Sequence, residues 1–216
     1  MFIGVYDYTV ILTYMSLCSS LYGISCAIKS DFKAAVICLM ISGLCDMFDG
    51  KVARTKKNRS EEGKAFGIQI DSLCDLVSFC VFPAVLVNCI VSGPGWAGAR
   101  NWLVKIGGAL LVLAGVIRLA YFNVTEEERQ KETTEGRKYY LGLPVTSTAL
   151  IFPLVCAISL IMGKGLTGGM IAHTTLLYAE ALFFVWDIKV KKPGKLDIIF
   201  LSIIGLVIAG VIMFVK

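Results

Sequence analysis

Long apolar segments separated by short polar ones make up most of the sequence. Each has roughly 17–25 mostly apolar residues, the length that a helix needs to cross the hydrocarbon core of a membrane. Seven such segments can be read, at 9–28, 32–48, 67–91, 102–123, 144–162, 168–186 and 197–215. The pattern predicts an all-α, polytopic membrane helix bundle that forms a single domain over residues 1–216. The last segment is the easiest to separate from the rest.

Composition agrees with a membrane protein. Hydrophobic residues make up 56% of the chain and charged residues 17%, whereas a soluble domain needs more polar surface. No basic N-terminal region followed by a cleavage site is visible, so we expect no removable signal peptide. The eight cysteines lie within apolar segments and form no CxxC pair. Since a free cysteine behaves as a small hydrophobic residue, we predict that they pack, and we expect no zinc site.

The basic residues indicate an orientation. Three loops, at 51–64, 124–140 and 187–196, lie on one side of the predicted bundle and hold fourteen of the 21 lysines and arginines. The positive-inside rule places these loops and the N-terminus in the cytoplasm, and we expect a multi-pass protein of the cell membrane. The net charge of +5 follows from this bias and suits anionic lipid headgroups. Nothing in the pattern supports a nucleic-acid partner.

Four carboxylates stand out because ionisable residues within a membrane span are costly and mark candidate functional sites. Asp46 and Asp49 are three residues apart and Asp71 and Asp75 are four apart, so each pair shares one helix face. Their two antiparallel spans are joined by the basic 51–64 loop, which places both pairs at the same cytoplasmic depth. Such carboxylates repel one another unless cations lie between them, and oxygen ligands favour Mg²⁺ or Mn²⁺. The alternative is a set of helix-end carboxylates solvated at the interface.

The residues around these carboxylates suit a phosphate ligand. Gly50 and Gly67 flank the cluster, and glycine lets a backbone approach a ligand closely. Arg54 adds a cation whose planar fork matches phosphate. The whole arrangement, Asp46-Met-Phe-Asp49-Gly50-Lys-Val-Ala53-Arg54, a twelve-residue spacer and Gly67-Ile-Gln-Ile-Asp71-Ser-Leu-Cys-Asp75, resembles the signature of the CDP-alcohol phosphotransferases. The spacer is longer here than is usual in that family, which a surface loop tolerates at little cost.

Three further stretches resemble the small phosphatidylserine synthases of that family. They are Asp71-Ser-Leu-Cys-Asp75-Leu-Val-Ser-Phe79, Arg118-Leu-Ala-Tyr-Phe-Asn123 and Gly142-Leu-Pro144-Val. The chain departs from their pattern at Cys80 and Phe82, where Gly and Ala are frequent, and at Ser16, where Asn is common. The segment 197–215 also exceeds the family's six-helix core, so we expect six core helices plus an additional C-terminal span.

The resemblance implies an enzyme of phospholipid biosynthesis. It would transfer the phosphatidyl-type group of CDP-diacylglycerol or CDP-archaeol to the hydroxyl of L-serine and release CMP. Two divalent ions, Mg²⁺ or Mn²⁺, would be bound by Asp46, Asp49, Asp71 and Asp75. Asp75 is expected to act as the general base, and a homodimer is implied. Gly50, Ala53, Arg54 and Gly67 would hold the CDP moiety.

The acceptor pocket is expected to contain Arg118 and Asn123. Arg118 lies too deep in its span for an ordinary interface anchor, and its fork can bind a carboxylate through two hydrogen bonds. It could instead snorkel to the interface or pair with Glu180, and we favour a structural pair for Glu180. Asn123 could instead form a cap or an interhelical hydrogen bond.

Other functions stay open at this point. Within the family, the acceptor could be glycerol phosphate or inositol phosphate, as in phosphatidylglycerophosphate or inositol-phosphate synthases. Those acceptors need extra cations, and the membrane interior offers only Arg118. A small cation transporter is the alternative from another class, although its carboxylates would be expected at the midplane.

Overall fold

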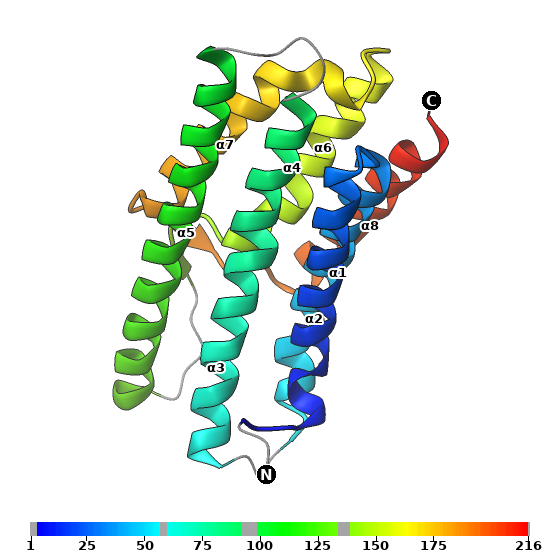
Figure 1. Cartoon of the computed structure of the whole chain (residues 1–216). Helices are drawn as coiled ribbons and strands as arrows, with labels where there is room; N and C mark the ends of the chain where they lie inside the picture. The colour runs from blue at the N-terminus through cyan, green and yellow to red at the C-terminus, as the bar shows by residue number, and fades with distance from the viewer. Residues whose placement is uncertain (1–3, 57–59, 92–98, 134–138, 216) are drawn as a thin grey trace.

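The computed structural model describes residues 4–56, 60–91, 99–133 and 139–215, which form a helix bundle (Figure 1). The helices are α1 (Ile11–Ile28), α2 (Phe32–Ala53), α3 (Glu61–Leu76), α4 (Phe82–Val91), α5 (Ala99–Glu132), α6 (Thr148–Ile161), α7 (Met170–Val185) and α8 (Lys195–Phe214). A π-helical turn, η2 (Val77–Val81), joins α3 to α4, and short 3₁₀ turns are η1 (Tyr8–Val10), η3 (Val145–Ser147) and η4 (Leu166–Gly169). The predicted all-α bundle is confirmed.

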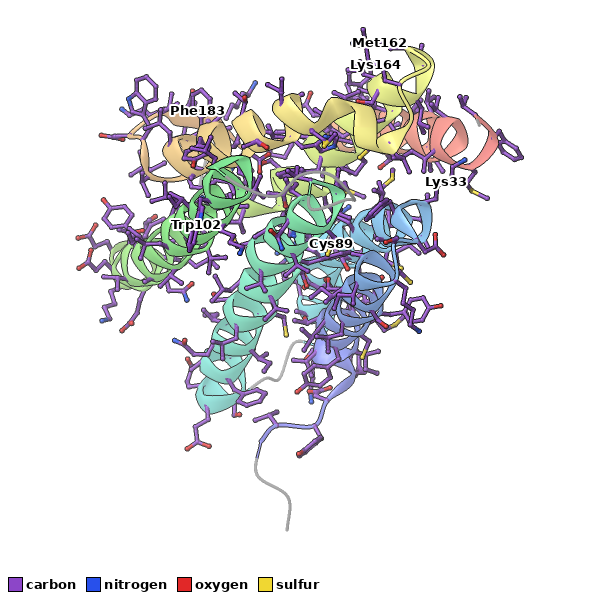
Figure 2. All side chains as sticks on the ribbon, turned by 45° about the horizontal axis from the view of Figure 1, so that its top comes forward. Lys33, Cys89, Trp102, Met162, Lys164 and Phe183 are labelled. Carbon is purple, nitrogen blue, oxygen red and sulfur yellow. The ribbon has the colours of Figure 1, made fainter. Side chains whose placement is uncertain are left out.

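Four helical stretches are long and apolar enough to cross a membrane. They are Tyr8–Ile28, Glu61–Val91, Trp102–Arg129 and Leu196–Phe214, and two shorter apolar helices cover Val145–Ile161 and Met170–Val185. The protein is therefore a multi-pass membrane protein. The C-terminal segment is among the four, as expected, and its end lies beside the start of α2, because Lys33 Nζ donates a hydrogen bond of 2.7 Å to the carbonyl of Val215 (Figure 2).

Several predicted boundaries are wrong, because polar residues extend the helices beyond their apolar parts. The span predicted to start at 67 begins at Glu61, where the Ser60 side chain caps the helix by accepting a 3.1 Å hydrogen bond from the Gly63 amide. The span predicted to end at 123 continues as α5 to Glu132. Two ion pairs stabilise this polar extension: Arg129–Glu126 at 2.6 Å and Lys131–Glu127 at 2.9 Å.

A small antiparallel strand pair was not predicted. β1 (Tyr139–Leu141) pairs with β2 (Lys189–Lys191), and Tyr140 lies opposite Val190. The pair ties the α5–α6 connection to the α7–α8 connection. Of the basic residues assigned to these loops and to 51–64, Lys57, Arg59, Arg137 and Lys138 lie outside the described residues.

Small residues allow α1 and α2 to pack closely. The Ser16 hydroxyl donates to the Ser42 carbonyl at 3.2 Å, and the hydroxyls of Ser20 and Ser42 lie 2.7 Å apart. A Cβ placed on Gly23 of α1 would lie 2.8 Å from Cβ of Cys38 in α2 and 2.3 Å from Cζ of the fully buried Phe82 in α4. These contacts fix α2, which carries the first two candidate carboxylates, against its neighbour.

Five of the eight cysteines have the packing role that their apolar surroundings predict, whereas Cys18 is exposed. All eight are free thiols, and Cys26, Cys38, Cys74, Cys80 and Cys156 are buried. The single histidine, His173, is fully buried and satisfied at both ring nitrogens, with Nε2 3.2 Å from the Cys156 sulfur and Nδ1 2.8 Å from the Gly169 carbonyl oxygen.

We predict that Gly23→Ala destabilises the bundle, since the added methyl group overlaps Phe82 and the neighbouring Cys38. Overpacking of this kind costs about 1–3 kcal/mol. The matched control is Gly205→Ala in α8, where a new Cβ meets nothing within 4 Å. Thermal unfolding of both variants in detergent should show a lower Tm for Gly23→Ala alone, and equal Tm values would contradict the close contact.

Candidate active site

The four candidate carboxylates meet where α2 ends and α3 begins its apolar part. Ligand oxygens of Asp46, Asp49 and Asp71 all lie within 4.8 Å of one another. The carboxyl group of Asp75 interacts directly with that of Asp46, and Asp49 interacts with Asp71. Each interaction joins α2 to α3, so the two faces that helical spacing defines are turned toward each other.

This carboxylate cluster has the chemistry of a divalent-metal site. Anionic oxygens at such separations repel strongly in surroundings of low polarity, and a hard cation removes that repulsion while using them as ligands. A metal ion therefore fits the cluster of Asp46, Asp49 and Asp71. The direct contact of Asp75 with Asp46 places a fourth carboxylate at its edge.

A third helix supports the cluster through a residue that the sequence did not reveal. The Thr13 hydroxyl of α1 donates a 3.1 Å hydrogen bond to Oδ2 of Asp49, and both side chains are buried. A buried hydrogen bond of this kind holds one ligand oxygen in a fixed orientation. A threonine in an apolar span gives little signal of such a role, because threonine hydroxyls can also bond to the carbonyls of their own helix.

The residues expected to bind CDP line the same end of the bundle. Gly50 follows Asp49 directly, Ala53 is the last residue of α2, and Arg54 is its C-cap. The Arg54 guanidinium folds back over Gly50, with Nη1 3.5 Å from the position of a glycine Cβ, and it lies within electrostatic range of Asp49. On α3, Gly67 lies one turn before Asp71. The structure thus brings the whole predicted motif to one region.

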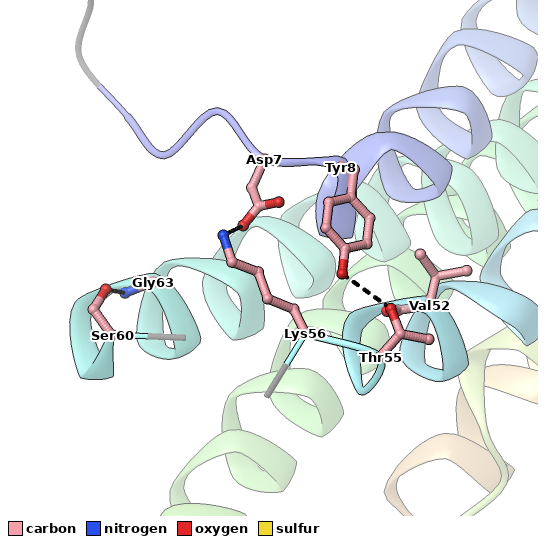
Figure 3. A network of polar contacts seen from close by, with 7 residues as sticks. All are labelled: Asp7, Tyr8, Val52, Thr55, Lys56, Ser60 and Gly63. Carbon is pink, nitrogen blue, oxygen red and sulfur yellow. Dashed lines mark hydrogen bonds and ion pairs between the residues drawn. The ribbon is translucent and has the colours of Figure 1, made fainter. Parts of the chain in front are cut away.

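The N-terminal segment fastens the end of α2, which was not predicted (Figure 3). Asp7 forms an ion pair with Lys56, and the hydroxyls of Tyr8 and Thr55 lie 3.1 Å apart. The ammonium group of Lys56 lowers the pKa of Asp7, so the ion pair persists at neutral pH and weakens only in acid. These contacts hold the chain that directly follows Arg54.

The two residues expected in the acceptor pocket have different surroundings. Arg118 of α5 is 9% exposed, so it does not snorkel to the surface. Asn123, five residues further on, exchanges hydrogen bonds with Ser72 of α3: its Nδ2 donates at 2.9 Å, and the Ser72 hydroxyl donates to its Oδ1 at 3.2 Å. The interhelical hydrogen bond that the sequence left open for Asn123 is therefore present.

Glu180 of α7 does not form the structural pair expected for it. The side chain is 1% exposed, and neither carboxylate oxygen has a hydrogen-bond partner among the described residues. Among the described residues, Glu180 forms no ion pair, so it is not paired with Arg118. A structural ion pair therefore does not explain why a carboxyl group is buried at this position.

The Gly142-Leu-Pro144 stretch has a backbone role. Gly142 has a positive φ of +73°, and a Cβ there would lie 2.5 Å from the Phe184 carbonyl oxygen. Only glycine fits this position without strain. The Leu143 amide donates to the Phe183 carbonyl at 2.9 Å, which fixes the entry of the chain into η3 and α6 beside the end of α7.

Sequence comparison agrees with the motif. Residues 8–186 match the sequence profile of the CDP-alcohol phosphatidyltransferases. The chain is 37% identical over 129 residues to a CDP-diacylglycerol–serine O-phosphatidyltransferase of Saccharomyces cerevisiae, covering 59% of this chain and 42% of that protein. It is 32% identical over 140 residues to an archaetidylserine synthase of Methanothermobacter thermautotrophicus, covering 65% and 53% respectively. A CDP-diacylglycerol–serine O-phosphatidyltransferase of Mycobacterium bovis is 25% identical over 187 residues, covering 87% and 62%. The chain thus spans about half the length of the curated relatives it matches.

We predict that Thr13→Val weakens metal binding at the carboxylate cluster, because Asp49 loses the hydrogen bond that the Thr13 hydroxyl of α1 donates to it. Loss of such a supporting hydrogen bond lowers metal affinity roughly 10-fold. Titration of purified protein with Mn²⁺, followed by electron paramagnetic resonance, measures the affinity directly. Thr174→Val on α7 is the control, since its hydroxyl bonds to the Met170 carbonyl. Equal affinities in the two variants would show that Thr13 does not orient the ligand.

Proposed function

Since the chain belongs to the CDP-alcohol phosphatidyltransferase family, we propose that it transfers the phosphatidyl-type group of a CDP-activated lipid to the hydroxyl of L-serine. The donor is CDP-diacylglycerol or CDP-archaeol, and CMP is released. The observation that carries the proposal is the convergence of Asp46, Asp49 and Asp71 beside Gly50 and Arg54. The names of the relatives, which are serine phosphatidyltransferases and an archaetidylserine synthase, support serine as the acceptor.

The carboxylates divide the work of the site between binding and proton transfer. Asp46, Asp49, Asp71 and Asp75 would hold two divalent ions, Mg²⁺ or Mn²⁺, which when bound neutralise the pyrophosphate and stabilise the displacement. Gly50, Ala53, Arg54 and Gly67 hold the cytidine and its phosphates. Asp75, at the edge of the carboxylate cluster, accepts the proton of the serine hydroxyl. The hydroxyl oxygen forms a bond to the lipid-linked phosphorus, the bond from that phosphorus to the CMP oxygen breaks, and CMP leaves.

The buried charge favours serine over an acceptor that carries a phosphate group. Among the residues that the structure describes, Arg118 is the one cationic side chain that is buried. One guanidinium matches one carboxylate bidentately, whereas an alcohol phosphate carries more negative charge. Arg118 is therefore assigned to the serine carboxylate, and Asn123 positions α5 against Ser72 of α3 at the margin of this acceptor region.

The distribution of basic residues supports the location. The positive-inside rule places the end of α2, and hence the active site, on the cytoplasmic side of the cell membrane. The enzyme is proposed to act there as a homodimer.

The first test is CMP release by purified protein in detergent, with CDP-lipid and a panel of acceptors. L-serine should support release, EDTA should abolish it, and Mg²⁺ or Mn²⁺ should restore it. Release with an alcohol phosphate and none with serine would instead favour the glycerol-phosphate or inositol-phosphate activity. Full activity in excess chelator would contradict the metal site, and uptake of metal ions by vesicles containing the purified protein, without any CMP release, would favour a transporter.

The second test separates the proton acceptor from the carboxylate-binding residue. Asp75→Asn keeps the shape of the side chain but removes its basicity, so turnover should fall on the order of 10²–10⁴-fold. Arg118→Lys keeps the charge but loses the planar fork, so KM for serine should rise while KM for CDP-lipid stays the same. Both are measured by CMP release with each substrate varied in turn. If Arg118→Lys weakens CDP-lipid and spares serine, Arg118 belongs to the donor site.

A further inference from the structure

Three side chains on η2, η3 and α7 carry buried polar atoms without a hydrogen-bond partner among the described residues. The Ser78 side chain is fully buried and the Glu180 side chain is 1% exposed. Neither the Ser78 hydroxyl nor the two Glu180 oxygens have a hydrogen-bond partner among the described residues. The same holds for the hydroxyl of Ser147, which belongs to η3, and η3 packs against η2. Buried polar atoms are nearly always satisfied in folded proteins, so this group indicates a polar ligand.

Glu180 lies in the same part of the bundle as the residues assigned to the acceptor. Cys80 of η2 lies against α5, since a Cβ on Gly115 would be 2.3 Å from its sulfur. The Cys80 thiol is within electrostatic range of three side chains from three different helices: Asp75 of α3, Arg118 of α5 and Glu180 of α7. Asp75, Arg118 and Glu180 therefore lie in the same part of the bundle, each within electrostatic range of one thiol.

A structural explanation of Glu180 fails on comparison with His173, which lies two turns earlier on the same helix. His173 is equally buried, but a sulfur atom and a backbone carbonyl satisfy both of its ring nitrogens. Glu180 has no comparable partner. A carboxyl group in a membrane bundle without a partner is strongly destabilising, so a packing role does not account for it.

We propose that Glu180 binds the ammonium group of the acceptor and so selects a hydroxylated amino acid. This inference rests on the proposed function. It adds recognition of the ammonium group to the recognition of the hydroxyl by Asp75 and of the carboxylate by Arg118. A serine zwitterion presents a hydroxyl, a carboxylate and an ammonium group. Asp75, Arg118 and Glu180 match these three groups in charge and in hydrogen-bonding character.

The test compares L-serine with 3-hydroxypropionate, which has the same hydroxyl and carboxylate but no amino group. In Glu180→Gln, KM for serine should rise roughly 10- to 100-fold, the usual loss for a hydrogen bond to a charged group. The inhibition constant of 3-hydroxypropionate against serine should not change, whether this compound reacts or only competes. KM for CDP-lipid and the metal requirement should also stay the same.

Two variants on α7 control for general damage to the site. His173→Gln removes a buried polar contact outside the acceptor region, so it should lower Tm. The ratio of KM for serine to the inhibition constant of 3-hydroxypropionate should stay as in the unmutated enzyme. Glu180→Asp keeps the charge on a shorter side chain and should recover part of the serine affinity that Glu180→Gln loses.

A second measurement needs no variant and so decides the matter even if Glu180→Gln does not fold. Dicyclohexylcarbodiimide modifies carboxyl groups in apolar surroundings, and mass spectrometry of peptides locates the modified residue. In the enzyme without substitutions, serine should protect Glu180 from modification by dicyclohexylcarbodiimide, while 3-hydroxypropionate should not.

The outcomes separate the two proposals. If the unmodified enzyme does not use serine, the proposed function fails, and the role of Glu180 falls with it. If it uses serine but Glu180→Gln keeps the original KM, or if both compounds are weakened equally, the ammonium role alone is overturned. Protection of Glu180 by both compounds would overturn it as well.

Discussion

Mutual repulsion among four carboxylates is the constraint on which the rest of the structure depends. Asp46 and Asp49 from α2 face Asp71 and Asp75 from α3 across a bundle of low polarity. Such charges hold together only if cations or protons lie between them, and only if the helices cannot move apart. The serine contacts between α1 and α2 and the Thr13 hydrogen bond act on α2, and the Asp7–Lys56 ion pair acts on the residues that follow its end. The packing of the N-terminal third therefore serves to keep one helix end in place.

Much of the site could be predicted because helical periodicity fixes which residues share a face. Spacings of three and four residues were enough to turn both carboxylate pairs inward, and apolar length was enough to locate seven helical segments. The predicted boundaries failed where polar residues continue a helix beyond its apolar part, at Glu61 and at Glu132. Hydropathy has no signal for a helix that is stabilised by capping and by ion pairs.

Contacts between distant segments could not be predicted from local pattern. Thr13 reaches Asp49 and Asp7 reaches Lys56 only once the tertiary structure forms. The π-helical turn after Asp75 is equally invisible in composition, although such turns are frequent at functional sites. The pairing expected for Glu180 was wrong for the same reason: charge complementarity with Arg118 suggested a partner, but the two side chains do not form an ion pair.

The C-terminal helix α8 adds exposed apolar surface to the bundle at a distance from the carboxylate cluster. The family match ends at residue 186, before α8 begins. On this helix Leu196, Leu206 and Phe214 are each at least 74% exposed, whereas Ile208 and Ile212 are buried against the bundle. The helix packs on α6 and α2, and Lys33 at the start of α2 bonds to the carbonyl of Val215. That attachment is at the opposite end of α2 from Asp46 and Asp49. The added helix thus enlarges the apolar surface and steadies the far end of α2 without entering the active site, so the carboxylate geometry is compatible with six core helices or with seven.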